Sequence, residues 1–146
     1  MAAARRDCPK AVPTCPHRTW KGPPYTRSSR AAAHSAGNSF DDTKLAASNQ
    51  LSQNSSLSTT LRDAYEGCMN DYAPADSSID HIADEALPSC RFKGLADEYT
   101  RVITSVEKCR VRLLSPTLVK TPLYPMVLAD RNKAVLANLL GKLLGI

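Results

Sequence analysis

The sequence predicts an all-α protein, with a small domain of three to four helices preceded by a long, irregular, proline-rich basic arm. Apolar residues recur at intervals of three and four in the C-terminal part of the chain, as on one face of a helix. By contrast, five of the ten prolines fall within the first 24 residues. Of the 146 residues, 42% are apolar but only 5% are aromatic, which predicts a modest core of Leu, Val, Ile and Ala.

Residues 1–56 are predicted to form an extended basic arm and a linker. Prolines prevent regular helix in the arm. Aromatic and basic residues are mixed there, and such a mixture can stack on bases or lie along a protein groove. The candidate partner-binding residues of the arm are Trp20, Tyr25, Arg18 and Lys21. The stretch after the arm is rich in Ala, Ser, Asn and Gln, so we expect a linker with at most a short helix over Thr43–Gln53.

Residues 57–146 are predicted to form the helical domain. Its first helix begins at an N-cap, Ser58 or Thr59, and ends before Pro74. A second, shorter helix follows and ends at Pro88, because proline cannot continue a helix.

The third predicted helix, over Gly94–Leu114, has the clearest pattern in the chain. Its apolar residues follow one stripe: Leu95, Tyr99, Val102, Ile103, Val106, Cys109 and Leu113. Acidic residues begin this helix and basic residues end it, the order that the helix dipole favours. Pro116 is expected to stop it. The stripe therefore predicts the central core helix.

Residues 116–128 contain further prolines and are predicted to be an extended connector. Asp130 is then expected to cap a last helix, whose apolar residues lie on one side: Val135, Leu136, Leu139, Leu140, Leu143 and Leu144. This face could close the core, dock into the groove of a partner or lie on a membrane surface. The candidate partner-binding residues of this helix are Leu136, Leu139, Leu140 and Leu143.

Five cysteines form no obvious framework, and intracellular thiols are the default interpretation. Cys68, Cys90 and Cys109 lie on or beside helices that should pack together. They could form a disulfide, but buried free thiols are favoured. Cys8 and Cys15 are separated by six residues, which does not fit the usual spacing of zinc ligands.

No catalytic or cofactor site is predicted. His81 has Asp80 and Asp84 as near neighbours, but no nucleophile elbow accompanies them, and a solvated helix face is the better interpretation. The sequence contains no Walker loop, no G-x-G-x-x-G and no H-E-x-x-H. We therefore expect a protein that is not an enzyme and holds no metal and no cofactor.

The charges are strongly segregated. Residues 1–40 carry seven Lys or Arg against one Asp, residues 62–99 carry three against nine Asp or Glu, and residues 100–146 carry eight against two. Such segregation predicts either an acidic partner, such as RNA, anionic lipid or a neighbouring subunit, or internal pairing between the segments.

The sequence has no apolar run long enough for a transmembrane helix and no secretory h-region, while its basic, acid-poor start is similar to a transit segment. We therefore expect an accessory subunit of a large mitochondrial assembly, respiratory or ribosomal, that wraps and bridges neighbouring protein subunits, with a cytoplasmic location as the alternative. The alternative function is a small helical nucleic-acid-binding protein, such as a viral silencing suppressor that binds double-stranded RNA.

Overall fold

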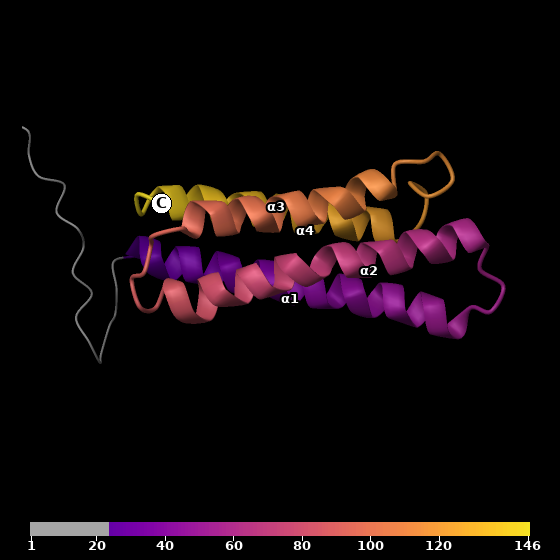
Figure 1. The fold of residues 1–146 in the computed structure, drawn as a ribbon, viewed down its shortest axis with the longest axis horizontal. Helices are drawn as coiled ribbons and strands as arrows, with labels where there is room; N and C mark the ends of the chain where they lie inside the picture. The colour runs from indigo at the N-terminus through magenta and orange to yellow at the C-terminus, as the bar shows by residue number, and fades with distance from the viewer. Residues whose placement is uncertain (1–23) are drawn as a thin grey trace, which may run out of the picture.

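The computed structural model describes residues 24–146. They form four α-helices: α1 (Pro24–Gln53), α2 (Thr59–Asp80), α3 (Leu95–Arg112) and α4 (Leu123–Lys142). A π-helical turn, η1 (His81–Ala86), continues α2. Consecutive helices run in opposite directions along an elongated bundle (Figure 1). The predicted all-α class is confirmed, whereas the predicted arm over residues 1–23 lies outside the described residues.

Helix α3 is the core helix that the apolar stripe predicts. Leu95, Val102 and Val106 are fully buried, as are Tyr99 and Cys109. The helix begins with acidic and ends with basic residues, as its dipole favours. The strongest pattern in the sequence therefore marks the helix around which the core is built.

Helix α1 replaces the linker that the sequence predicts over most of residues 24–53. Its buried face consists of Phe40 among small residues, which are Ala33, Ala36 and Ala47 together with Thr26, Ser29 and Thr43. Alanine is the best helix former, and it lets neighbouring helices approach closely. A search for large apolar residues misses such a face, which explains the difference.

Helix α2 runs without interruption through Pro74, where the sequence predicts a break between two helices. Proline inside a helix removes a hydrogen bond and costs about 3 kcal/mol. Tyr72 and Ile79 are both buried, one on either side of this proline, so tertiary packing outweighs that cost. The predicted N-cap is confirmed, since the Ser58 side chain accepts a hydrogen bond from the backbone N–H of Leu61 at 3.3 Å.

Helix α4 begins at Leu123, within the segment predicted to be an extended connector. Pro125 is tolerated because the first-turn N–H groups of a helix have no intrahelical partner. Asp130 is not a cap but lies fully buried inside the helix. The other buried residues of its C-terminal half are small: Ala134, Ala137 and Gly141.

Of the three arrangements that the sequence leaves open for the leucine face of the last helix, closure of the core is not the one that the structure shows. Leu136, Leu139 and Leu143 point outward and expose between 52% and 63% of their surface. The small residues face inward because the neighbouring helix comes too close for larger ones. A Cβ added at Gly141 would lie 2.8 Å from the ring of Tyr99, closer than real contacts allow.

A disulfide joins α2 to α3 between Cys68 and Cys109, with Cα atoms 4.6 Å apart. The structure therefore forms a disulfide between Cys68 and Cys109, where the sequence favours buried thiols. Cys90, the third, lies half-buried in the loop before α3 and is not part of this bond. The two bonded cysteines are 41 residues apart, so only the pairing of α2 with α3 brings them together.

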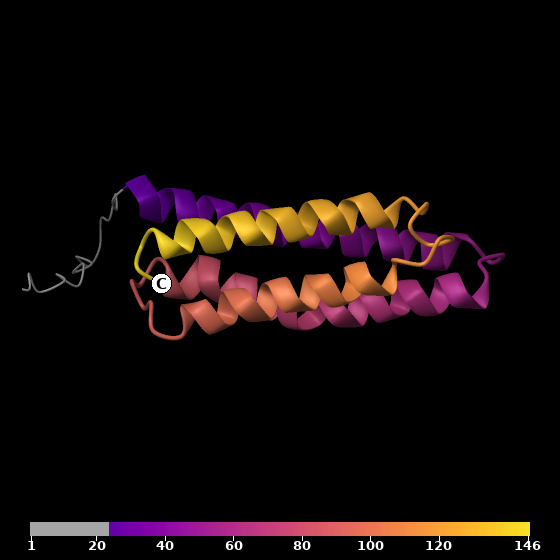
Figure 2. The same cartoon turned by 90° about the horizontal axis from the view of Figure 1, so that it is seen from above.

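Seen from above, α1 lies beside α4 and α2 lies beside α3 (Figure 2). The bundle thus has a face made by α2 and α3 and, on the other side, a face made by α4 and α1. Within residues 24–146, no helix is long and apolar enough to cross a membrane.

Candidate partner-binding surfaces

An acidic groove lies between the end of α2, the π-helical turn η1 and the first half of α3. It has a volume of about 680 Å³ and is lined by Ser77, Asp80, His81, Asp84, Glu85, Glu98 and Arg101. Four carboxylates and one guanidinium line it, so it is negative at neutral pH. We call these seven residues the acidic groove.

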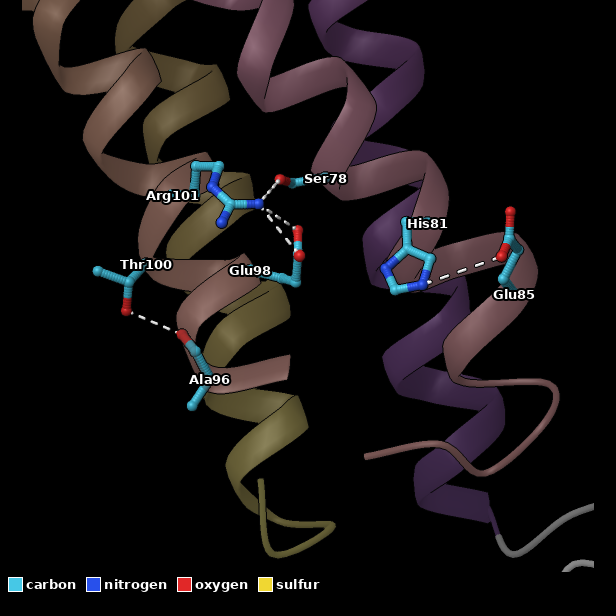
Figure 3. Close-up of polar contacts among 7 residues, drawn as sticks. All are labelled: Ser78, His81, Glu85, Ala96, Glu98, Thr100 and Arg101. Carbon is cyan, nitrogen blue, oxygen red and sulfur yellow. Dashed lines mark hydrogen bonds and ion pairs between the residues drawn. The ribbon is translucent and has the colours of Figure 1, made fainter. Parts of the chain in front are cut away.

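The only arginine of the acidic groove is already engaged. Arg101 donates hydrogen bonds to both carboxylate oxygens of Glu98 at 3.1 Å, and to the Ser78 hydroxyl at 3.4 Å (Figure 3). On the opposite wall, Nε2 of His81 lies 3.9 Å from a carboxylate oxygen of Glu85. The carboxylates of η1 are therefore not neutralised by Arg101.

Helix α1 supports η1 from behind. Nε of Arg30 donates to the Ala83 carbonyl at 3.0 Å, and Asp84 lies 3.7 Å from Nη2 of Arg30 and 3.3 Å from Nε2 of His34. These ion pairs are about half exposed, and exposed pairs contribute only about 0–1 kcal/mol each. A partner could therefore replace them at little cost.

A smaller groove of about 540 Å³ lies along the same α2–α3 face. Its apolar part is formed by Ile103 and Val111, and its edge by the ion pair of Arg112 with Asp71 at 3.0 Å. Arg112 lies across Gly67, where a Cβ would meet its guanidinium group. The α2–α3 face therefore offers an acidic section beside an apolar one.

A second exposed surface runs along the outside of α4. We call it the leucine row, and it consists of Leu128, Leu136, Leu139 and Leu143. Its helix carries Arg131, Lys133 and Lys142 but no exposed acidic residue, since Asp130 is buried. This surface is thus apolar with basic flanks, unlike the acidic groove.

The structure brings together only some of the predicted partner-binding residues. Leu136, Leu139 and Leu143 belong to the leucine row, while Leu140 is half-buried. Tyr25 is exposed at the start of α1, at the end of the bundle where α4 ends (Figure 2). The remaining three, Arg18, Trp20 and Lys21, lie outside the described residues. The role of these residues in partner binding stays a prediction.

Sequence reasoning interpreted the carboxylates of the acidic groove as an ordinary solvated face. The available signal was the excess of acidic residues over residues 62–99. Composition does not show that η1 lies beside α3, and this packing brings Glu98 into the same groove as Asp80 and Glu85. In the part of the chain that the structure describes, no group of three or more His, Cys, Asp or Glu side chains could hold a metal ion.

No protein-family model matches the sequence, and no curated protein matches it. The fold, however, matches the crystal structure of a pectin methylesterase inhibitor from Arabidopsis thaliana. The TM-score is 0.74 and the sequence identity 14%, and the match covers 86% of this chain and 81% of that chain. The two proteins share a fold, and the Arabidopsis protein is an inhibitor rather than an enzyme.

This likeness corrects the predicted function. The accessory subunit of a mitochondrial respiratory or ribosomal assembly was the wrong prediction, and so was the RNA-binding alternative, because the fold is shared with a plant enzyme inhibitor. The predicted mitochondrial location and its cytoplasmic alternative are wrong on the same ground. Part of the charge segregation has an internal explanation, since the acidic segment pairs with both basic ones, through Arg30 with Asp84 and Arg112 with Asp71.

Proposed function

We propose that this protein is a non-catalytic inhibitor that binds a pectin methylesterase or a closely similar enzyme. The observation that carries the proposal is the shared fold, which extends over 86% of this chain. Binding another protein needs only an exposed, complementary surface, and both the acidic groove and the leucine row are exposed.

The acidic groove is the surface that we assign to the enzyme. Pectin is an acidic polysaccharide, and removal of its methyl esters exposes further carboxylates. An enzyme that acts on such a chain is expected to have a substrate cleft with positive potential. An acidic surface is complementary to such a cleft, and complementary charges speed encounter and select the partner.

Within the groove, Asp80, Asp84 and Glu85 would face the cations of the enzyme. Within residues 24–146, the ion pairs of Asp84 and Glu85 are long or exposed, so these carboxylates can exchange them for contacts with a partner. Glu98 and Ser78 hold Arg101 in place, which makes it a fixed donor for a carbonyl or carboxylate of the enzyme.

The same proposal places the protein outside the cell. Its support is the disulfide between Cys68 and Cys109, because disulfides persist in oxidising compartments and are rare in the cytosol.

The test is a titration of the oxidised protein against a plant pectin methylesterase acting on methylesterified pectin, with acid release followed at constant pH. We expect stoichiometric loss of activity. The double variant Asp84→Lys with Glu85→Lys should weaken inhibition at least tenfold and leave the helical circular dichroism unchanged.

The matched control is Asp63→Lys with Glu66→Lys, which makes the same change of charge on exposed residues of α2 outside the acidic groove. This control should inhibit like the wild type. Equal losses in both double variants would point to net charge rather than the groove. The proposed function would be refuted if the folded wild type neither bound nor inhibited any plant pectin methylesterase.

A further inference from the structure

Asp130 is a carboxylate buried at the centre of the bundle, with no exposed surface. Its oxygens accept three hydrogen bonds, from the hydroxyls of Ser39 at 2.5 Å, Thr43 at 2.6 Å and Tyr72 at 2.6 Å. The donors belong to α1 and α2 and the acceptor to α4, so the cluster ties three helices together. Of the ion pairs formed within residues 24–146, none includes Asp130.

The charged neighbours of this cluster are few. Lys133 on α4 acts on Asp130 by charge alone. On the side of α1 and α2, Lys44 pairs with Asp76. The residues that α3 buries in the core are Leu95, Tyr99, Val102, Ser105, Val106 and Cys109. None of them is charged at neutral pH, since burial raises the pKa of Tyr99 to about 12.

Three neutral hydroxyls make an unusual environment for a buried charge. A hydroxyl both donates and accepts hydrogen bonds. If the carboxyl takes up a proton, it can donate to one hydroxyl while the other two still donate to it, so all three contacts survive. A carboxylate held by backbone N–H groups would instead lose a contact on protonation. Here the proton removes the cost of the buried charge and keeps the network.

The pKa of Asp130 shifts in the direction that this geometry implies. Burial raises it, and this effect exceeds the opposing effect of the hydrogen bonds from Ser39, Thr43 and Tyr72. An unfolded aspartate titrates near pH 3.9. Between about pH 3.9 and the higher native pKa, the folded protein therefore binds a proton that the unfolded chain does not.

We propose that the Asp130 cluster is an acid-dependent clamp that holds α4 to α1 and α2 more firmly as the pH falls. Because the native state binds the extra proton, the free energy of unfolding rises with falling pH. The contribution is complete below about pH 3.9 and is lost as the pH rises through the native pKa of Asp130. The unfolding equilibrium constant then changes by up to about tenfold per pH unit.

The test compares urea unfolding of the full chain between pH 4 and pH 8 for the wild type and Asp130→Asn. The amide is neutral at every pH and can still accept and donate hydrogen bonds. We expect wild-type stability to increase toward acid and Asp130→Asn to remove most of that increase. The exposed control Asp97→Asn should keep the wild-type slope.

Asp76→Asn serves as a second control, since burial raises the pKa of Asp76 too, against the opposing effect of Lys44. It should remove a smaller part of the slope. The proposal would be overturned if the free energy of unfolding of Asp130→Asn depended on pH as that of the wild type does. It would also be overturned if, toward acid, the wild type lost stability relative to Asp130→Asn.

A direct measurement covers the case in which Asp130→Asn does not fold. The carboxyl carbon of Asp130 can be titrated by NMR in the wild type, where a midpoint clearly above pH 3.9 is expected and one at or below that value refutes the clamp. Thr43→Val removes one donor to the carboxylate and should shift the midpoint upward. None of these measurements depends on inhibitor activity.

Discussion

Helices α3 and α4 have similar lengths, yet α3 turns most of its large apolar residues toward the core, whereas the C-terminal half of α4 exposes leucines. In α3 the stripe of Val102 and Val106 faces the core, whereas in α4 Leu136 and Leu139 face solvent. Inward-facing positions in the C-terminal half of α4 hold alanine and Gly141. The densest apolar face of a helix is therefore not always its core face. Where two helices approach closely, the residues on the core side of the helix must be small.

The largest expected effect on stability comes from placing an aspartate on the core face of α3, compared with an aspartate on the solvent face of α4. Val106→Asp buries an unpaired carboxylate, which costs several kcal/mol against a total stability of about 5–15 kcal/mol, so we expect the domain to unfold. Leu139→Asp should change stability by no more than about 0.5 kcal/mol. Thermal melts followed by circular dichroism measure both. Similar losses in the two variants would show that the leucine row is covered in the native protein.

A smaller effect is expected where α3 and α4 touch. Gly141→Ala puts a methyl group against the ring of Tyr99, and such overpacking costs about 1–3 kcal/mol. The gain in helix propensity, about 1 kcal/mol, offsets only part of this. We therefore expect a lower urea midpoint.

The matched control for that contact is Gly67→Ala in α2. Its new methyl group would meet only the end of the Arg112 side chain, which can move away. The control should be as stable as the wild type or slightly more stable. A stable Gly141→Ala together with a destabilised Gly67→Ala would mean that the small residues of α4 are not needed for close packing.

The smallest effect on stability is expected from the triple variant Leu136→Ser, Leu139→Ser and Leu143→Ser. These side chains are already half exposed or more, so each change should cost no more than about 0.5 kcal/mol. If the leucine row contacts a partner, binding measured by calorimetry should weaken although the fold persists. Unchanged binding would limit the partner to the α2–α3 face.

The sequence predicts the part of this fold that depends on local pattern. Helix α3 follows directly from its stripe, and the N-cap at Ser58 from its residue type. Helix α1 was missed because alanine gives no strong apolar signal, and the path of α2 through Pro74 depends on tertiary packing. The hydroxyl partners of Asp130 lie between 58 and 91 residues away, so nothing near Asp130 in the sequence indicates that it is buried.

The candidate site, too, is predictable from the sequence only in part. The acidic composition of residues 62–99 is visible in the sequence, but the groove exists only because η1 and α3 lie opposite each other. The sequence predicts Leu136, Leu139 and Leu143 as partner-binding residues but not Leu128, and the outward direction of this row depends on the close contact of Gly141 with Tyr99.

The alanine face of α1 has a consequence for how the native bundle opens. Phe40 is the only large apolar side chain that α1 buries fully, and burial stabilises by about 0.8 kcal/mol per CH₂ group, so α1 gains less from docking than its 30 residues would suggest. Helices α2 and α3 bury more large side chains and are also joined covalently. Native proteins open in cooperative units, the least stabilised first. We therefore expect helix α1 to detach at the lowest free energy, leaving the cross-linked hairpin of α2 and α3 as the last part to lose its structure.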